Sequence, residues 1–132
     1  MTDSTNIEHH RLPDALRERL PGFENTPEYL VIRDTGGDLP DVVCGALGSL
    51  LQRLEVEMLE KRLDAAGRQM LDRVYRVIEE LATSNDIETV NAVVVDVLEL
   101  LSNTPLVVDR ITARLGPATR ALYDRWIIGP VP

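Results

Sequence analysis

Cysteine, histidine and aromatic residues are all scarce in this chain of 132 residues. Its only cysteine, Cys44, cannot form an intramolecular disulfide, and zinc sites of the cysteine type need at least a pair. The two histidines, His9 and His10, lie in a polar N-terminal segment, where we expect them to be solvated. No glycine-rich phosphate-binding loop is present. The sequence therefore favours a protein that is not an enzyme and needs no cofactor and no metal.

Long apolar runs and a surplus of positive charge are also missing. No run approaches the roughly 18 to 20 apolar residues of a transmembrane helix, and the polar start differs from a secretory signal peptide. The chain has 14 Lys and Arg against 22 Asp and Glu, for a formal charge of −8. Such acidity argues against binding to the phosphates of nucleic acid. We expect a cytoplasmic protein that binds neither nucleic acid nor a membrane.

What the sequence does contain is a series of helix signals. Proline or a capping residue opens most segments, and glycine or proline closes them. Apolar residues recur at spacings of three and four through most of the chain after residue 38. The predicted fold is all-α, a compact helical bundle or short helical stack of five or six helices. It comprises a flexible N-terminal arm over residues 1–11 and a single domain over 12–132.

Some local features are predicted less uniquely. Residues 28–33 fit one or two helical turns or a short extended piece. The run at 93–95 contains three valines, which suit a strand as well as a helix, but the spacing on both sides of it favours helix. Asp38 is the expected N-cap of the helix that follows it, and Asn85 with Glu88 has the spacing of a capping box. The predicted core consists of the residues on the apolar arcs: Leu50, Leu54, Val74, Ile78, Leu81, Val94, Val97, Leu98, Leu101, Ile111, Leu115 and Trp126.

The helix near residues 40–58 carries small residues beside its apolar stripe, at Gly45, Gly48 and Ser49. Glycine lowers helix stability by roughly 1 kcal/mol relative to alanine, so its presence there has a reason. One reason is close packing of another helix against these positions. The other is a groove or partner surface, which would allow the chain to form a homodimer or larger homo-oligomer.

Negative charge is concentrated in one stretch. Residues 77–109 hold seven acidic residues and no lysine or arginine, whereas residues from Arg110 onward are mostly basic among their charges. If the two helices of this stretch form a hairpin, their acids form one patch. The patch either solvates the fold and pairs with the final helices, or docks a basic protein surface. The candidate partner-binding residues are Glu79, Glu80, Asp86, Glu88, Asp96 and Glu99.

Residues 74–126 also carry a pattern of short helical strings. The strings are Ile78-Glu79-Glu80-Leu81, Ser84 with Asp86, Val90-Asn91-Ala92-Val93, Leu98-Glu99-Leu100-Leu101, and Leu115-Gly116-Pro117 with Thr119-Arg120. This order resembles small all-helical bacterial proteins similar to the immunity proteins of polymorphic toxin systems. The resemblance implies a helical protein without an active site that binds and neutralises a cognate toxin domain.

The expected function is therefore a non-enzymatic protein-binding module, an immunity-type inhibitor that reaches a basic toxin domain through its acidic surface. The alternative is a homo-oligomeric structural or adaptor module that packs through the uncharged face of Gly45, Gly48 and Ser49.

Overall fold

A computed structural model describes residues 6–129, which form seven α-helices and contain no strand. The helices are α1 (Leu12–Arg19), α2 (Pro27–Ile32), α3 (Pro40–Leu59), α4 (Ala65–Ala82), α5 (Ile87–Ala92), α6 (Pro105–Arg114) and α7 (Pro117–Leu122). The predicted all-α fold is confirmed, and the ambiguous segment near residues 28–33 is the short helix α2. Within this range no helix is both long enough and apolar enough to span a membrane.

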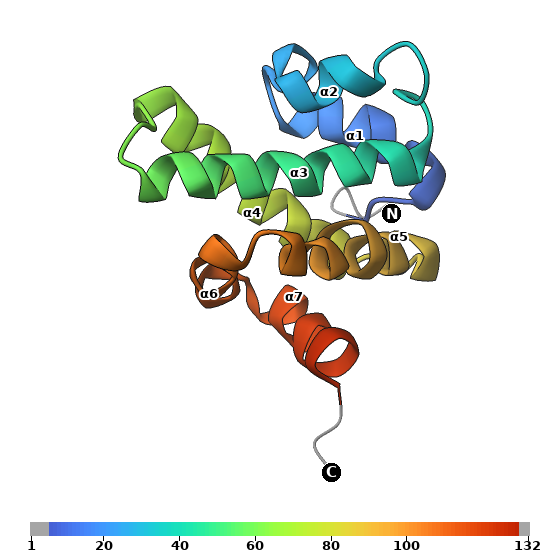
Figure 1. The fold of residues 1–132 in the computed structure, drawn as a ribbon. Helices are drawn as coiled ribbons and strands as arrows, with labels where there is room; N and C mark the ends of the chain where they lie inside the picture. The colour runs from blue at the N-terminus through green and yellow to red at the C-terminus, as the bar shows by residue number, and fades with distance from the viewer. Residues whose placement is uncertain (1–5, 130–132) are drawn as a thin grey trace.

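Helix α3 is the central element of the fold (Figure 1). Its buried residues Val43, Leu47, Leu50 and Leu54 recur at spacings of three and four, as the sequence predicted for its apolar stripe. In the view of Figure 1, α1 and α2 lie above α3, and α6 and α7 lie below it. Because partners pack on several sides, α3 has a narrow exposed strip rather than a wide solvated face.

A continuous helical rod follows α4. It begins as α5, continues as the π-helical turn η3 (Val93–Leu98) and ends as the 3-10 stretch η4 (Glu99–Asn103). The helical interpretation of the three valines is thus confirmed, with a π turn in place of a regular α turn. A π turn contains more residues per turn than an α-helix, so it changes which side chains face inward. Val93 is buried, whereas Val94 is half-buried and Val95 is exposed.

Most of the predicted core residues are buried, but the assignment of Trp126 to the core is wrong. Trp126 is 58% exposed, and Val94 and Leu115 are half-buried. Trp126 belongs to η5 (Tyr123–Ile128), a second π turn at the edge of the bundle, and its ring lies 4.9 Å from the Arg125 guanidinium. An amphipathic pattern identifies an apolar side, but at the end of a bundle it does not establish that another element covers that side. The first third of the chain supplies core residues that the sequence pattern did not: Leu12, Leu16, Leu20 and Phe23.

The flexible N-terminal arm expected over residues 1–11 does not include residues 6–11, because these residues pack against the fold. Ile7 is buried, and its carbonyl accepts hydrogen bonds from the hydroxyls of Ser84 at 2.7 Å and Thr89 at 2.9 Å. Asn6 accepts one from the Asn85 N–H at 2.7 Å. The remainder of the expected arm, residues 1–5, lies outside the described residues. The packed domain therefore begins before the predicted boundary at residue 12.

Two predicted helix caps are displaced by one residue. The side chain that caps α5 belongs to Asp86, which accepts from the Glu88 N–H at 3.0 Å, and not to Asn85. At α3 the N-cap position is occupied by Leu39 rather than Asp38, without a side-chain hydrogen bond. At α5 two adjacent polar residues offer alternative caps, whereas α3 begins with Pro40 in its first turn and has no side-chain cap.

Candidate functional site

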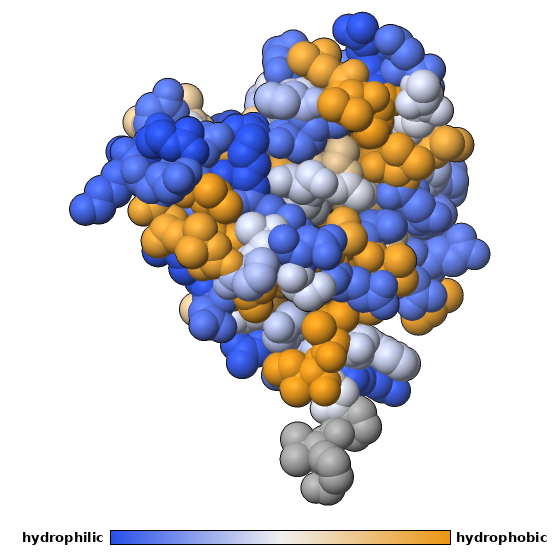
Figure 2. Space-filling view, viewed as in Figure 1, coloured by the Kyte–Doolittle hydropathy of each residue, from blue (hydrophilic) through white to orange (hydrophobic). Residues whose placement is uncertain are grey.

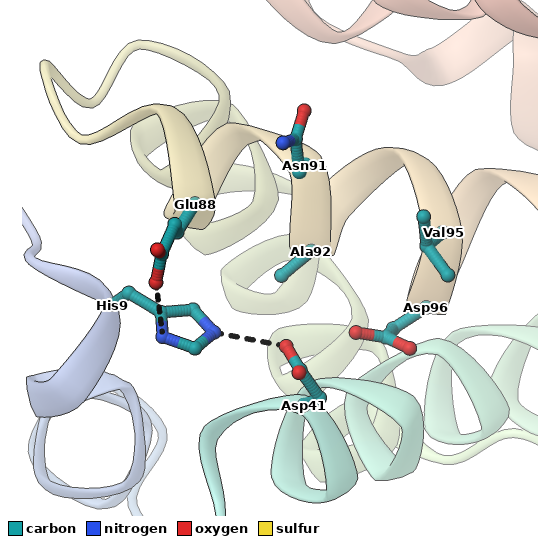
Figure 3. Close-up of a pocket in the computed structure, with 7 residues that line it drawn as sticks. All are labelled: His9, Asp41, Glu88, Asn91, Ala92, Val95 and Asp96. Atoms are coloured by element: carbon teal, nitrogen blue, oxygen red, sulfur yellow. Dashed lines mark hydrogen bonds and ion pairs between the residues drawn. The ribbon is translucent and has the colours of Figure 1, made fainter.

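An acidic hollow of about 250 Å³ opens between the start of α3 and the rod that follows α4 (Figure 3). Its ionisable side chains are His9, Asp41, Glu88 and Asp96, which come from the N-terminal segment, the start of α3 and the rod. We call this group the acidic hollow. Three carboxylates with one histidine give it a surplus of negative charge.

His9 lies between two of these carboxylates. Its Nε2 atom is 2.9 Å from Asp41 Oδ1, and its Nδ1 atom is 3.4 Å from Glu88 Oε2. The His9 side chain is 20% exposed, so the expectation that it would be solvated is wrong, whereas His10 is exposed. The sequence contains no local signal for this arrangement, because the partners of His9 are 32 and 79 residues away.

Asp96 faces Asp41 across the hollow (Figure 3). It belongs to the π turn η3, whose backbone approaches α3 closely: a Cβ placed on Gly48 would lie 2.6 Å from the Asp96 carbonyl oxygen. Desolvation, followed by the nearby charge of Asp41, raises the pKa of Asp96 to about 6. A carboxylate in this position is stabilised by any cation that enters the hollow.

Asp86 supports the hollow from behind. Its Oδ2 accepts from the backbone N–H of His9 at 2.8 Å, and its Oδ1 accepts from the Glu88 N–H. These hydrogen bonds, that from His9 first, lower the pKa of Asp86. Asp86 therefore fixes the position of His9 and the start of α5, and its charge is already used within the fold.

The predicted acidic patch is divided by the structure. Asp86, Glu88 and Asp96 gather around His9, and Glu99 is exposed one turn beyond Asp96. Glu79 and Glu80 do not join them, because both are half-buried and contact other helices. Glu79 accepts from the N–H groups of Ala118 and Thr119 at the start of α7, and Glu80 pairs with Arg19 of α1 at 2.8 Å. The expected outer arc of α4 is thus partly an internal contact.

The small residues of α3 are also divided between two roles. Gly48 is buried against the backbone of the rod, which confirms close helix packing at that position. Gly45 is different, since a Cβ there would meet no atom within 4 Å. Gly45 and Ser49 line an open hollow of about 470 Å³, whose apolar walls come from α2 and from Leu100. We call this hollow the α3 groove.

Sequence reasoning missed a charge cluster around a buried acid near the other end of α3. Glu55 is fully buried, and its Oε1 atom accepts from Arg114 Nη1 at 2.7 Å. Arg114 also pairs with Asp72 at 3.0 Å and lies over the ring of Tyr75 at 4.6 Å. Removing one member of a buried ion pair usually costs several kcal/mol, so this cluster fastens α6 to α3 and α4. The sequence signal was the position of Glu55, an acid that directly follows Leu54 of the apolar stripe.

The chemistry of these groups suits binding. Across the described residues, no set of three or more His, Cys, Asp or Glu is arranged to hold a metal ion. Cys44 is buried and burial raises the pKa of its thiol, which keeps it in the protonated, unreactive form. The acidic hollow can accept a guanidinium or ammonium group by charge-assisted hydrogen bonds.

Comparison with known proteins identifies a family for this chain. No curated protein and no solved structure matches the chain. A family described as "Domain of unknown function" matches residues 13–129, which include all seven α-helices except the first residue of α1. Because this match covers most of the sequence, the chain belongs to the DUF7674 family.

Proposed function

We propose that this protein is a non-enzymatic binding module that neutralises a basic partner protein through its acidic hollow. The resemblance of residues 74–126 to immunity proteins suggests that the partner is a toxin domain and that the complex forms in the bacterial cytoplasm. The proposal needs neither a cofactor nor contact with nucleic acid or membrane.

The observation that carries the proposal is the surplus of carboxylates in one accessible hollow. Asp41, Glu88 and Asp96 open onto the same space, and the His9 ring lies between Asp41 and Glu88. An arginine or lysine of a partner would supply the missing positive charge and remove the repulsion between Asp41 and Asp96. Surface carboxylates elsewhere pair mostly with neighbouring arginines, as Asp14 does with Arg17.

A negative hollow also accelerates the encounter with a basic partner. Charge complementarity raises association rates and selects against partners of the wrong sign, and the effect weakens as salt screens it. Toxins that act on nucleic acid need a cationic substrate surface, which an acidic protein can occupy in place of phosphate. This gives a physical reason for an acidic inhibitor without any catalytic group.

The test is complex formation with the protein encoded by the neighbouring gene. We expect the two proteins to co-purify and the complex to protect cells from that protein. Replacing three residues together, as Asp41→Asn, Glu88→Gln and Asp96→Asn, should slow association at least about tenfold at low salt and abolish protection. Lowering the pH from 7 to 5 should also weaken the wild-type complex, because Asp96, whose pKa is about 6, becomes protonated.

The matched control removes three acids that lie away from the hollow, as Glu18→Gln, Glu24→Gln and Asp34→Asn. All three are exposed, and because each replacement removes one negative charge, the control has the same net charge as the test variant. It should retain most of the association rate and full protection. Equal binding by the two variants, or no complex with the neighbouring protein, would contradict the proposal.

The homo-oligomer remains the alternative function, in a reduced form. Gly48 is covered by the rod and cannot contribute to an interface, whereas Gly45 and Ser49 line the open α3 groove. A mass in solution that rises with protein concentration above 14.7 kDa and returns to the monomer value in Gly45→Arg would favour this alternative.

A further inference from the structure

The α3 groove is a furrow with a small floor and apolar walls. Val42, Gly45, Ala46 and Ser49 form its floor on one strip of α3. Its upper wall is α2, where Val31 is 80% exposed, and the opposite wall includes Leu100. On this face of the molecule, Figure 2 shows apolar residues over α2 and on both sides of the paler strip along α3.

The floor leaves room for a close approach. No atom lies within 4 Å of the position of a Cβ on Gly45, and the neighbouring floor positions are alanine, serine and valine. The distance between packed helix axes depends on the side chains at the contact, and small residues permit the shortest distances. The open space above Gly45 therefore permits a helix to approach α3 closely.

The furrow extends beyond the groove in both directions. Ser49 is shared with a second hollow of about 420 Å³ that reaches Gln52, Val56 and Thr104. At the other end, Val42 follows Asp41, which lines the acidic hollow. From Asp41 to Val56 the strip of α3 measures about 22 Å, at about 1.5 Å per residue, which corresponds to about four turns of a partner helix.

The charges along the furrow differ at its two ends. The hollow near Val56 is lined by two arginines, Arg53 and Arg62, and one glutamate, Glu57. Near Val42, the carboxylates Asp41 and Asp96 exceed the single histidine. A helix in the furrow is therefore complementary in charge when it carries lysine or arginine at the end that meets Asp41.

We infer that the furrow along α3 binds one amphipathic helix of a partner protein. The apolar side of that helix faces Gly45 and Ser49, and its basic end enters the acidic hollow. Binding of an amphipathic helix in an apolar groove is a recurrent mode of recognition, in which residues at helical spacing serve as anchors. The inference rests on the proposed function and specifies how the basic partner is recognised.

The test uses two synthetic peptides of about four helical turns. Both have leucine and alanine on one side, and they differ only in carrying lysine or glutamate at one end. We expect the lysine peptide to shift the amide resonances of Val42, Gly45, Ser49 and Leu100 in the ¹⁵N-labelled protein. The glutamate peptide should bind at least about tenfold more weakly, because it meets Asp41 and Asp96 with like charge.

Two variants block the furrow without relying on the same change. Gly45→Leu fills the open floor, and Val31→Asp places a charge on the exposed wall. Each should lower the affinity for the lysine peptide at least about tenfold. Ile128→Asp is the matched control, because Ile128 is 60% exposed and belongs to η5, outside the furrow and the acidic hollow, and it should leave binding unchanged. Resonance shifts elsewhere, equal binding of both peptides, or no binding would overturn the inference.

A second copy of the chain is the competing occupant. If the protein self-associates and Gly45→Leu makes it monomeric while the lysine peptide does not bind, the furrow is a self-interface and the inference fails. The proposed function is judged separately. If Gly45→Leu still binds the neighbouring gene's product and the acidic-hollow variant does not, the inference fails and the proposed function stands.

Discussion

Gly45 and Gly48 are three residues apart on α3, yet their surroundings demand opposite responses to the same substitution. A methyl group on Gly48 would lie 2.6 Å from the carbonyl oxygen of Asp96, and this oxygen belongs to the backbone of the rod. A methyl group on Gly45 would enter open space. The glycine at 48 is therefore required by packing, whereas the glycine at 45 is not required by the fold.

We predict that Gly48→Ala destabilises the protein by about 1–3 kcal/mol, because the rod must move away from α3. Gly45→Ala should instead stabilise it by up to about 1 kcal/mol, since alanine is the better helix former. Urea unfolding followed by circular dichroism measures both changes. A destabilising Gly45→Ala would show that the open floor is already occupied in solution.

Hydrogen bonds between the Glu79 carboxylate of α4 and the first residues of α7 hold these two helices together. Glu79 accepts from the Ala118 N–H at 2.8 Å, the Thr119 N–H at 2.9 Å and the Thr119 hydroxyl at 2.7 Å. Burial acts to raise the pKa of Glu79, but these hydrogen bonds outweigh it and lower the pKa. A lowered pKa means that the contact stabilises the fold above pH about 4.5 and is lost as the pH falls through the lowered value.

We predict that Glu79→Gln weakens the docking of α7 by about 1–2 kcal/mol at pH 7. The substitution replaces one acceptor oxygen with an NH₂ group, which cannot accept a hydrogen bond, and it removes the negative charge from the other oxygen. Amide hydrogen exchange of Ala118 and Thr119 should become faster. Glu80→Gln is the control, since the adjacent Glu80 contacts α1 and its loss should leave these two amides unaffected. Unchanged exchange in Glu79→Gln would remove Glu79 from this role.

At the scale of elements, the sequence predicted what depends on local periodicity. The stripe at Val43, Leu47, Leu50 and Leu54 identifies the buried side of α3 because each residue contributes to one arc. The π turns were not predictable in this way. Their residues are typical of helices, but the additional residue in the turn changes which side chains face the core. Trp126, which belongs to the π turn η5, was wrongly assigned to the core because its apolar spacing does not indicate whether another element covers it.

The candidate site was only partly predictable. Glu88 and Asp96 were recognisable as acids without nearby positive charge in the sequence. Their meeting with His9 and Asp41 depends on how the N-terminal segment and α3 pack against the rod, which no local pattern encodes. The contact of Glu79 was not predictable from the sequence, because its partners are the N–H groups at the start of α7, about 40 residues away.

The net charge of −8 has a different meaning once the whole molecule is considered. Several acids are used internally: Glu55 is buried with Arg114, Glu79 holds α7, and Glu80 pairs with Arg19. The acids that remain together at the surface are those of the acidic hollow. That hollow is completed by the N-terminal segment, which closes the fold by contacting residues about 80 positions away.

We predict that Ile7→Ala destabilises the whole molecule by about 2–4 kcal/mol, because Ile7 is buried and its neighbours cannot fill the space. The variant should also release His9 from Asp41, which is detectable as a change in the His9 ring resonances. Glu8→Ala, at an exposed neighbouring position, should change the free energy of unfolding by less than about 0.5 kcal/mol. Equal stability of the two variants would contradict a closing role for this segment.

The position of Cys44 has a practical consequence for kinetics. Its thiol is buried between α3 and the start of the rod, where its Sγ atom lies 3.7 Å from the Ala92 carbonyl oxygen. A thiol reagent can reach it only after these two elements separate, and burial also keeps the thiol protonated. The rate of labelling at this natural single site would thus count the opening events of the surface on which both proposals depend, without any engineered probe.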